Sequence, residues 1–586
     1  MYISELRLWN FRKYTREGGA IDTTTPHLVV PFRKGLNILV GENDSGKTAI
    51  IDAIKFVTKT HSLEWIRLCD SDFSFGCDEL RIEVIMKDLS EADSNLFLDI
   101  INYNPETGEM YLDLVLEAKR KDDRILPYEV KAFDGQLEGM NAEQKEYLKA
   151  TYLRALRDAD NELTAKKNSR TSQILLGHDL FKEGSAGKEQ FESIFQEANQ
   201  KIKNWFNDEN GGENSNKSQI KDIIDSFVHA FLSDNYSSEL SISDPTIRSI
   251  LEKVSIGFGG SGNLGLGSMN RLFMATELLH LKKKSDGVRI CLIEELEAHL
   301  HPQAQMKVLE SLQLEKDVQF IMTTHSPNLA SKLKLDSETT SMILCKDSDV
   351  YPLGKGMTRL VDADYKYLDN FLDVTKSNLF FAKGIILVEG WAEELILPPL
   401  AANQGFPLST YEVSIVNVGS TAYLHFARIL MRNDGKQLNY PVSIVTDYDV
   451  RPEENWSFDK TKEREKLESI ERKLNREGCS NISLFLATHW TLEWCLFNSV
   501  ALSKLFMQCC MEVHSHTDEF KKGEDEQWDK DRYKLKLAEK MKDQTLDKVQ
   551  IAALLSQKIR EIDSPIDIAE GDTASYLIKA IKFACK

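Results

Sequence analysis

The sequence predicts an α/β protein with two parallel-sheet domains in tandem, a helical insertion in the first domain and a helical tail. A buried-strand run at 36–40 leads into a glycine-rich turn and then into apolar residues at helical spacing. From 385 to 449, strand and helix patterns alternate, which is typical of a second parallel sheet. Between about 160 and 243, strand patterns are absent and charge rises, which indicates inserted helices.

Composition narrows the class of protein. Of the 586 residues, 42% are hydrophobic and 28% are charged, which is typical of a globular chain and excludes wholesale disorder. The 73 Lys and Arg residues against 92 Asp and Glu give a net charge of −19, so any nucleic-acid contact needs a local basic surface. The denser basic clusters are Lys119–Lys121, Lys166 with Lys167 and Arg170, and Lys282–Lys284.

No apolar run reaches the roughly 20 residues that cross a bilayer. The first residues also lack a signal-peptide core, and the nine cysteines form no CxxC pair. We therefore expect a cytoplasmic protein with reduced thiols and neither zinc nor disulfides.

The elements divide into four predicted segments. Residues 1–159 form a first lobe, in which 81–89 and 110–119 alternate like antiparallel strands. Residues 160–243 form a helical hairpin, interrupted at 211–218. It is a partner-binding arm, a dimerisation element or a solvated helical excursion. Residues 244–370 return to the first domain, and 371–586 hold the second domain and a tail that is helical from about 499.

The segment GENDSGKT has the spacing GxxxxGK[ST] between a strand and a helix, which predicts a phosphate-binding loop. Its backbone N–H groups and the following helix N-terminus attract phosphate oxygens. We expect Lys47 to neutralise the β- and γ-phosphates of ATP and Thr48 to hold Mg²⁺. The remaining nucleotide-binding residues of the loop are Gly41, Asn43 and Gly46.

Two later strands supply the other half of this site. The run VRICLIEE ends in Glu294, expected beside Mg²⁺, and Glu295, expected to position the attacking water. The run VQFIMTTHS ends in His325, which fits a histidine that reads the γ-phosphate. The long separation of Lys47 from Glu294 implies an ATPase split by an insertion.

Together with NFRKY near the start and LIEELEAHLHP, these motifs resemble the ABC-type ATPase head of the RecF and SMC class. The resemblance implies that two heads sandwich ATP and that each offers a signature loop, here 263–272 with Ser268 and Asn270. This loop is degenerate, so we expect slow turnover with ATP binding retained.

A second acidic group follows the later strands. Glu389 comes just after one strand, with Glu393 expected one helical turn later on the same face. Asp447 and Asp449 end another strand. Carboxyl ends of parallel strands meet at one edge of a sheet, and residues two apart in a strand share a side. Four converging carboxylates repel one another unless cations balance them, which favours Mg²⁺ or Mn²⁺. Two such ions support phosphodiester cleavage.

This half resembles a TOPRIM domain, and an ABC-like head followed by TOPRIM resembles the OLD (overcoming lysogenization defect) endonucleases, including those of the Gabija antiphage system. The resemblance implies that Glu493 is a further metal ligand, that Lys548 approaches the scissile phosphate and that the helical insertion dimerises the chain. It also implies a possible UvrD-like helicase partner.

The sequence thus predicts an ATP-binding, metal-dependent endonuclease that cuts double-stranded DNA in antiphage defence. None of the 17 tyrosines lies in a context that marks a topoisomerase nucleophile. No zinc-binding cysteine module precedes the TOPRIM-like segment, which argues against a primase. Two alternatives remain open: a RecF- or SMC-like repair ATPase without nuclease activity, and a nuclease that targets RNA.

Overall fold

The computed structural model describes these residues: 1–16, 18–60, 66–122, 124–154, 163–167, 169–176, 178–181, 184–207, 216–231, 238, 246–257, 265–283, 287–475, 477–515, 520 and 530–586. Across these ranges, no helix is both long enough and apolar enough to cross a membrane.

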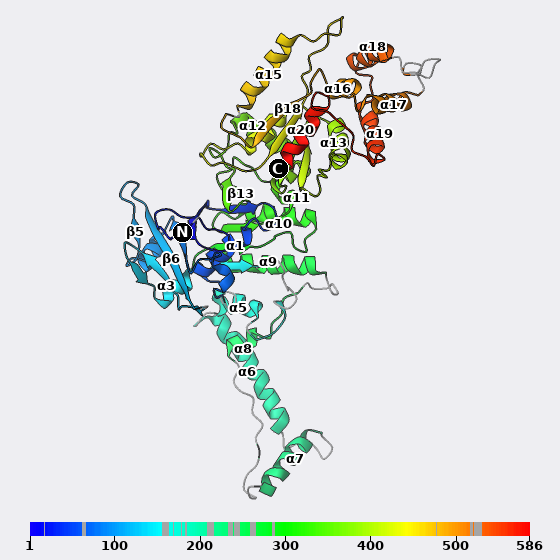
Figure 1. The fold of residues 1–586 in the computed structure, drawn as a ribbon. Coiled ribbons are helices and arrows are strands. Elements are labelled where there is room, and N and C mark those ends of the chain that lie inside the picture. The colour runs from blue at the N-terminus through cyan, green and yellow to red at the C-terminus, as the bar shows by residue number, and fades with distance from the viewer. Residues whose placement is uncertain are drawn as a thin grey trace.

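An antiparallel sheet forms one side of the first domain (Figure 1). Its strand order is β2-β1-β4-β6-β8-β9, with β5 and β7 pairing at the ends of β6. Alternate residues of β4, such as Ile82 and Val84, pack with α1 in one core, as the period-two pattern predicts. The bounds are β1 Tyr2–Trp9, β2 Leu28–Pro31, β4 Glu79–Lys87, β5 Asn102–Tyr103, β6 Met110–Lys121, β7 Arg124–Ile125, β8 Val130–Phe133 and β9 Leu137–Gly139.

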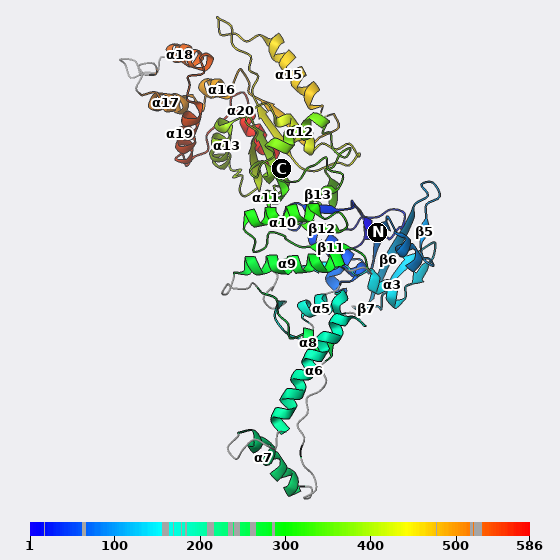
Figure 2. The same cartoon turned by 180° about the vertical axis from the view of Figure 1, so that it is seen from behind.

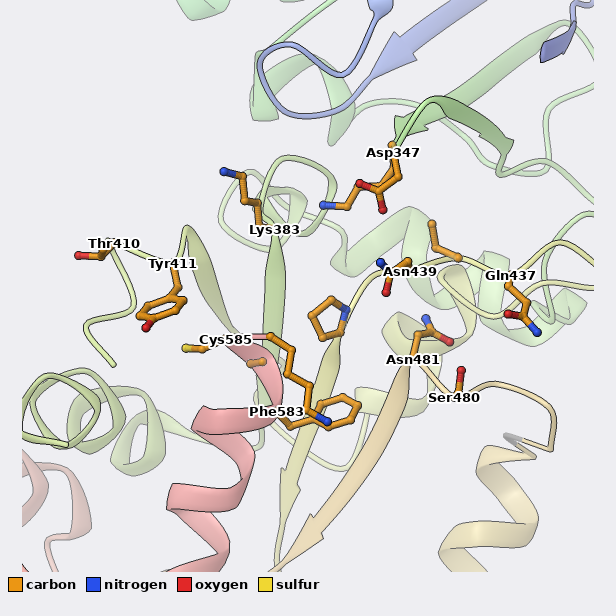
Figure 3. A pocket seen from close by; sticks show the side chains of 15 residues that line it. Asp347, Lys383, Thr410, Tyr411, Gln437, Asn439, Ser480, Asn481, Phe583 and Cys585 are labelled. Carbon is orange, nitrogen blue, oxygen red and sulfur yellow. The ribbon is translucent and has the colours of Figure 1, made fainter. Parts of the chain in front are cut away.

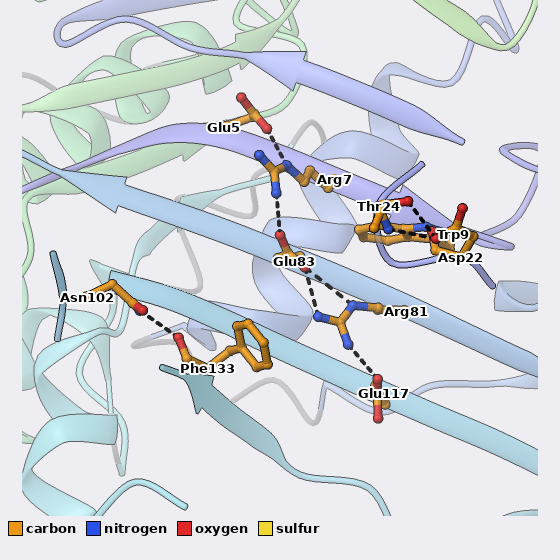
Figure 4. Close-up of polar contacts among 10 residues, drawn as sticks. All are labelled: Glu5, Arg7, Trp9, Asp22, Thr24, Arg81, Glu83, Asn102, Glu117 and Phe133. Carbon is orange, nitrogen blue, oxygen red and sulfur yellow. Dashed lines mark hydrogen bonds and ion pairs between the residues drawn. The ribbon is translucent and has the colours of Figure 1, made fainter. Parts of the chain in front are cut away.

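The other face of this sheet carries a series of ion pairs within and between β1, β4 and β6 (Figure 4). Arg7 contacts Glu5 and Glu83, with 2.8 Å from Arg7 Nη1 to Glu83 Oε1. Arg81 continues the series from Glu83, 2.9 Å away, to Glu117 on β6. These pairs satisfy charges that the tightly packed face would otherwise leave without partners.

A parallel sheet forms the centre of the first domain, in the order β10-β11-β12-β3-β13-β14, with only β14 antiparallel. Strands β3, β11 and β12 are buried at every residue, as continuous apolar runs predict. The bounds are β3 Leu36–Val40, β10 Thr151–Leu153, β11 Ile290–Ile293, β12 Gln319–Thr323, β13 Thr340–Lys346, β14 Asp349–Pro352, α1 Lys47–Thr58, α9 Leu266–Lys283, α10 Pro302–Leu314 and α11 Pro327–Ala330.

A helical arm projects from the first domain on the side opposite the second domain (Figures 1 and 2). Its main helices are α6 (Ala186–Asn207) and α7 (Asn216–Phe231), with α5 (Arg170–Leu176) and α8 (Ile247–Leu251) at its base. Large apolar side chains are exposed along the arm: Ile194, Ile202, Ile223, Phe227 and Phe231. Of the interruption expected at 211–218, residues 211–215 lie outside the described ranges and 216–218 belong to α7.

The second domain contains a four-stranded parallel sheet in the order β16-β15-β17-β18. Ile385 and Leu387 face a core that includes α14, whereas Ile386 and Val388 face the core of α13 and α20. The bounds are β15 Gly384–Val388, β16 Val413–Asn417, β17 Val442–Thr446, β18 Ile482–Leu486, α13 Trp391–Asn403, α14 Tyr423–Ile429, α15 Lys460–Leu474 and α16 Leu492–Asn498.

The tail is helical but packs back onto the second domain. Helix α19 lies against α13, and α20 covers β17 and β18, so the tail completes the domain core. The tail helices are α17 Ser503–Val513, α18 Lys530–Lys542, α19 Lys548–Arg560 and α20 Ser575–Ala584. The remaining short elements are α2 Glu91–Leu96, α3 Ala142–Tyr147, α12 Asp362–Phe371 and the 3₁₀ turns Asp70–Asp72, Asp179–Phe181 and Lys376–Phe380.

Candidate functional site

The phosphate loop joins β3 to α1 and requires glycine at both ends. Gly41 has φ 145° and Gly46 has φ 100°, which is backbone that L side chains rarely adopt. A Cβ on Gly41 would lie 2.5 Å from the Cys345 carbonyl oxygen, and one on Gly46 would lie 2.0 Å from the Tyr14 hydroxyl. The loop is therefore held closely between β13 and the N-terminal segment.

Lys47 is buried within the loop, and its Nζ donates to the Gly41 and Glu42 carbonyls at 3.0 and 2.7 Å. Burial lowers its pKa. Asn43 and Thr48 are exposed, so their side chains are accessible to a ligand. The Thr48 hydroxyl is thus open to a ligand, whereas the Lys47 ammonium would have to exchange its bonds to the loop for bonds to phosphate oxygens.

The N-terminal NFRKY segment supports this loop. The Tyr14 hydroxyl donates to the Gly46 carbonyl at 3.0 Å, and Lys13 Nζ donates to the Asp44 carbonyl at 2.9 Å. Arg12 pairs with Asp52 of α1 at 2.8 Å. The contacts give a structural reason for finding this motif together with a phosphate loop.

Glu294 and Glu295 follow β11. In the sheet, β12 lies between β11 and β3, the strand that leads into the phosphate loop. The Tyr152 hydroxyl donates to Glu294 Oε2 at 2.9 Å, while Glu294 Oε1 is buried without a partner among the described residues. Burial raises the pKa of Glu294. Glu295 is exposed, with φ 45°. One partnerless buried oxygen and one exposed carboxylate fit a metal ligand and a water-positioning group.

His325 follows β12, where burial and the charge of Lys47 lower its pKa. Its backbone N–H donates to Glu297, which also accepts from Thr324 Oγ1 at 2.9 Å. Sequence reasoning missed the role of Glu297, although it lies two residues after Glu295 in the same motif. Glu297 fixes the backbone that presents His325.

The candidate signature loop is only partly described, because 263 and 264 lie outside the described ranges. Ser268 and Asn270 lie in the first turns of α9. Asn270 is buried, and neither atom of its side-chain amide has a partner among the described residues. That this loop faces ATP bound to a second head stays a prediction.

The acids of the second domain follow two adjacent parallel strands. Glu389 comes directly after β15 and Asp447 directly after β17, with Val388 paired to Val445. Glu393 lies in the first turn of α13, and the buried Glu493 lies in the first turn of α16. Carboxylates from four segments therefore gather at the carboxyl edge of the sheet.

Four of these carboxylates form what we call the acid cluster: Glu389, Glu393, Asp447 and Glu493. Burial raises the pKa of Asp447 well above its usual range, and the other three charges raise it further. Burial also raises the pKa of Glu393 to about 7, with Glu493 and Glu389 adding to the shift. The cluster thus concentrates negative charge that the protein only partly compensates.

Lys548 provides part of that compensation. Its Nζ lies 2.9 Å from Glu493 Oε2, which also accepts from Thr491 Oγ1 at 2.8 Å. Burial lowers the pKa of Lys548, but the charge of Glu493 and their hydrogen bond outweigh it, so the net shift is upward. Lys548 begins α19, which places the tail beside the cluster.

The sequence predicts that Asp449 points to the same side as Asp447, but in the structure it does not. Strand β17 ends at Thr446, and Asp449 has φ 56°, so the two-residue alternation of a strand does not extend to it. Its half-exposed side chain pairs with Lys466 at 3.3 Å. Likewise, Glu389 precedes α13 rather than sharing a helix face with Glu393. Asp449 still acts on Glu389. Burial raises the pKa of Glu389, and the negative charge of Asp449 raises it further.

The donor set fits a hard divalent cation, because carboxylate oxygens are the ligands that Mg²⁺ and Mn²⁺ prefer. Within the described ranges, however, no three His, Cys, Asp or Glu side chains already lie within reach of a single ion. Ion binding would therefore require rotamer changes that bring the carboxylates closer together.

A separate 590 Å³ cavity lies at the opposite edge of this sheet (Figure 3). Lys383, Pro441 and Asn481, which line it, each directly precede a strand of the second domain. Asp347, from the turn between β13 and β14, lines it from the first domain. The cavity therefore belongs to the contact between the domains and not to the acid cluster.

Two family models match this chain. The AAA ATPase domain family model matches residues 1–256 and 120–330, which together span more than half of the chain. The model of the overcoming lysogenization defect protein-like TOPRIM domain matches residues 380–449. The second match includes Glu389, Glu393, Asp447 and Asp449.

Individual relatives are more distant. Endonuclease GajA of Bacillus cereus (strain HuB5-5) is 24% identical over 221 residues, which are 33% of this chain and 31% of GajA. The Septu protein PtuA of Bacillus thuringiensis is 23% identical over 347 residues, 55% of this chain and 74% of PtuA. The solved C-terminal region of the Xanthomonas campestris pv. campestris OLD protein is 21% identical, with a TM-score of 0.24, over 36% of this chain and 94% of that region. The chain thus matches less than a third of the length of GajA.

Proposed function

Because the chain belongs to the AAA ATPase domain family and combines this domain with an OLD-like TOPRIM domain, we propose that it is a nucleotide-regulated, divalent-metal-dependent DNA endonuclease of the OLD family. The similarity to GajA and PtuA supports a role in antiphage defence. The proposal includes double-stranded DNA as substrate and a cytoplasmic location.

The observation that carries the proposal is the acid cluster beside Lys548. Glu389, Glu393, Asp447 and Glu493 would hold two Mg²⁺ or Mn²⁺ ions, with Asp449 available at the rim. Bound ions would supply activated water and stabilise the leaving oxygen in phosphodiester hydrolysis. Lys548 would lie beside the scissile phosphate and stabilise the negative charge that develops there.

The nucleotide site supports binding and control. Lys47 and the loop N–H groups would hold the phosphates of ATP, Thr48 and Glu294 would hold Mg²⁺, and Glu295 would orient water. His325 would face the γ-phosphate from the end of β12. The degenerate signature loop supports slow turnover, in which ATP binding itself regulates cleavage.

The arm supports a homodimer as part of the same proposal. Five large apolar side chains exposed along α6 and α7 are costly in water and would be buried against a second arm. A UvrD-like helicase is a further proposed partner, which the resemblance to the OLD family implies.

Plasmid nicking with Mg²⁺ or Mn²⁺ tests the proposal. We expect wild type to cut, Asp447→Ala to lose cutting, and Lys47→Ala to keep cutting but lose its response to ATP. Equal cutting by wild type and Asp447→Ala would assign the activity to a contaminant. DNA binding without cleavage under either ion would favour the repair-ATPase alternative, and selective cutting of RNA would favour the RNA-nuclease alternative.

A further inference from the structure

Tyr576 places an unused hydrogen-bond donor in the core of the second domain. It lies in the first turn of α20, its side chain is 5% exposed, and its buried hydroxyl has no partner among the described residues. Burying a polar group without a hydrogen bond destabilises the folded state. A hydroxyl retained at that cost calls for a functional explanation.

The direction of α20 places Tyr576 toward the edge of the sheet that carries the acid cluster. Ser443 Oγ, near the start of β17, donates to the Ala580 carbonyl at 2.7 Å. The Ala584 carbonyl lies against Gly384 at the start of β15. The helix therefore runs opposite to the strands, and Tyr576, about 6 Å before Ala580 along the helix axis, lies closer to their carboxyl ends.

The residues before α20 attach it to α16, the helix that carries Glu493. Thr573 Oγ1 donates to the Cys495 carbonyl at 2.6 Å, and the Thr573 carbonyl accepts from Thr488 Oγ1 at 3.0 Å. Asp572 Oδ2 accepts from the Val500 N–H at 2.8 Å. These bonds fix the first turn of α20 beside α16, the helix that carries Glu493 of the acid cluster.

The electrostatics of Tyr576 agree with this placement. Burial raises the pKa of its hydroxyl well above the usual range, and Cys495, Asp447, Glu393 and Glu493 raise it further. The phenol therefore keeps its proton at neutral pH and remains a donor next to carboxylates that accept hydrogen bonds.

We propose that Tyr576 is a positioning residue: when the carboxylates of the acid cluster turn to bind a divalent cation, the Tyr576 hydroxyl donates a hydrogen bond to the Asp447 carboxylate and orients it as a ligand. The proposal rests on the metal site of the proposed function. Hydrogen bonds of this kind fix the direction of metal-binding carboxylates, and their loss typically lowers metal affinity or activity by 10- to 100-fold.

The test is Tyr576→Phe, which removes only the hydroxyl. Calorimetric titration of the full chain with Mn²⁺ should show binding about 10- to 100-fold weaker than wild type. The metal-free variant should unfold at the same temperature as wild type or higher, because no existing hydrogen bond is lost. Plasmid cleavage should fall at low Mn²⁺ and recover at high Mn²⁺.

Tyr365→Phe is the matched control, since Tyr365 on α12 is also a buried tyrosine, but its hydroxyl lies near Thr358 and not near the acid cluster. It should leave Mn²⁺ binding unchanged. Equal Mn²⁺ affinity in Tyr576→Phe and wild type would overturn the positioning role alone, and so would a loss of metal-free stability without weaker binding. A wild type that binds no Mn²⁺ would overturn the proposed metal site and this role with it.

Discussion

Lys346 Nζ lies 2.6 Å from Glu42 Oε1, so the last residue of β13 is bound to the second residue of the phosphate loop. The same ammonium group lies 4.9 Å from the ring centroid of Tyr440, which comes shortly before β17. Strand β17 in turn leads to Asp447. A continuous set of contacts thus connects the nucleotide loop with a strand that presents an acid of the cluster.

Lys346→Met should destabilise the protein by about 2–3 kcal/mol, because the Glu42 carboxylate, whose side chain is only 14% exposed, loses its hydrogen-bonded cation. The double variant Glu42→Gln/Lys346→Met should recover most of that loss. Chemical denaturation measures both, and Lys355→Met, which breaks an exposed pair with Asp362, should leave the stability nearly unchanged. If nucleotide acts through this contact, the double variant also loses the effect of ATP on cleavage. Equal destabilisation by the single and double variants would contradict the role of the ion pair.

The acid cluster predicts an unusual dependence of stability on pH. The pKa of Glu393 is raised to about 7, so the folded state binds this proton more tightly than the unfolded state does. Protonated Glu393 therefore stabilises the folded state below about pH 4.5, and this stabilisation is lost as the pH rises from about 4.5 to about 7. In metal-free protein, wild type should lose more stability over this range than Glu393→Gln, as measured by thermal unfolding at several pH values.

Mn²⁺ binding should tighten over the same pH range, because protons and the cation compete for the carboxylates. Asp113→Asn is a control: burial raises the pKa of Asp113 to about 7 as well, but it lies on β6, far in the fold from the cluster. That variant should change the pH dependence of stability and leave that of Mn²⁺ binding intact. Mn²⁺ binding independent of pH between 5 and 8 would contradict raised pKa values in the cluster.

Local patterns predicted the residues that follow strands. Glu294, Glu389 and Asp447 each come directly after a buried apolar run, and register then brings neighbouring strand ends together. The pattern could not show where β17 ends, and one turn past Thr446 was enough to direct Asp449 toward Lys466.

Contacts between distant segments were beyond sequence reasoning. The return of α20 to the sheet depends on Gly384, where any Cβ would meet the Ala584 carbonyl at 2.1 Å, although 200 residues separate the two. The Glu42–Lys346 pair likewise spans the helical insertion. Nothing in the local sequence of either partner marks such a pairing, since it arises from tertiary packing.

Gly46→Ala should abolish nucleotide binding. A left-handed conformation costs a residue with Cβ about 1–2 kcal/mol, and here the Cβ would also collide with the Tyr14 hydroxyl that supports the loop. Gly76→Ala is the matched control, because Gly76 also has positive φ, 75°, but nothing lies within 4 Å of an added Cβ. Gly76→Ala should destabilise the protein only by this conformational cost. It should keep its nucleotide affinity, which the binding of a fluorescent ATP analogue measures. Equal effects of the two substitutions would exclude the collision as the cause.

Lys548→Met should reduce cleavage about 10²- to 10³-fold, the usual effect of removing one group that stabilises developing negative charge. Among the described residues, the Glu493 carboxylate would then keep its bond from Thr491, and the cluster would lose Lys548 as a neighbouring cation. Lys558→Met on the same helix breaks a pair with Glu512, away from the cluster, and should leave the rate nearly unchanged. Single-turnover cleavage at saturating Mn²⁺ separates the two effects of Lys548, because a rate that recovers fully with excess metal would mean that it assists metal binding rather than the chemical step.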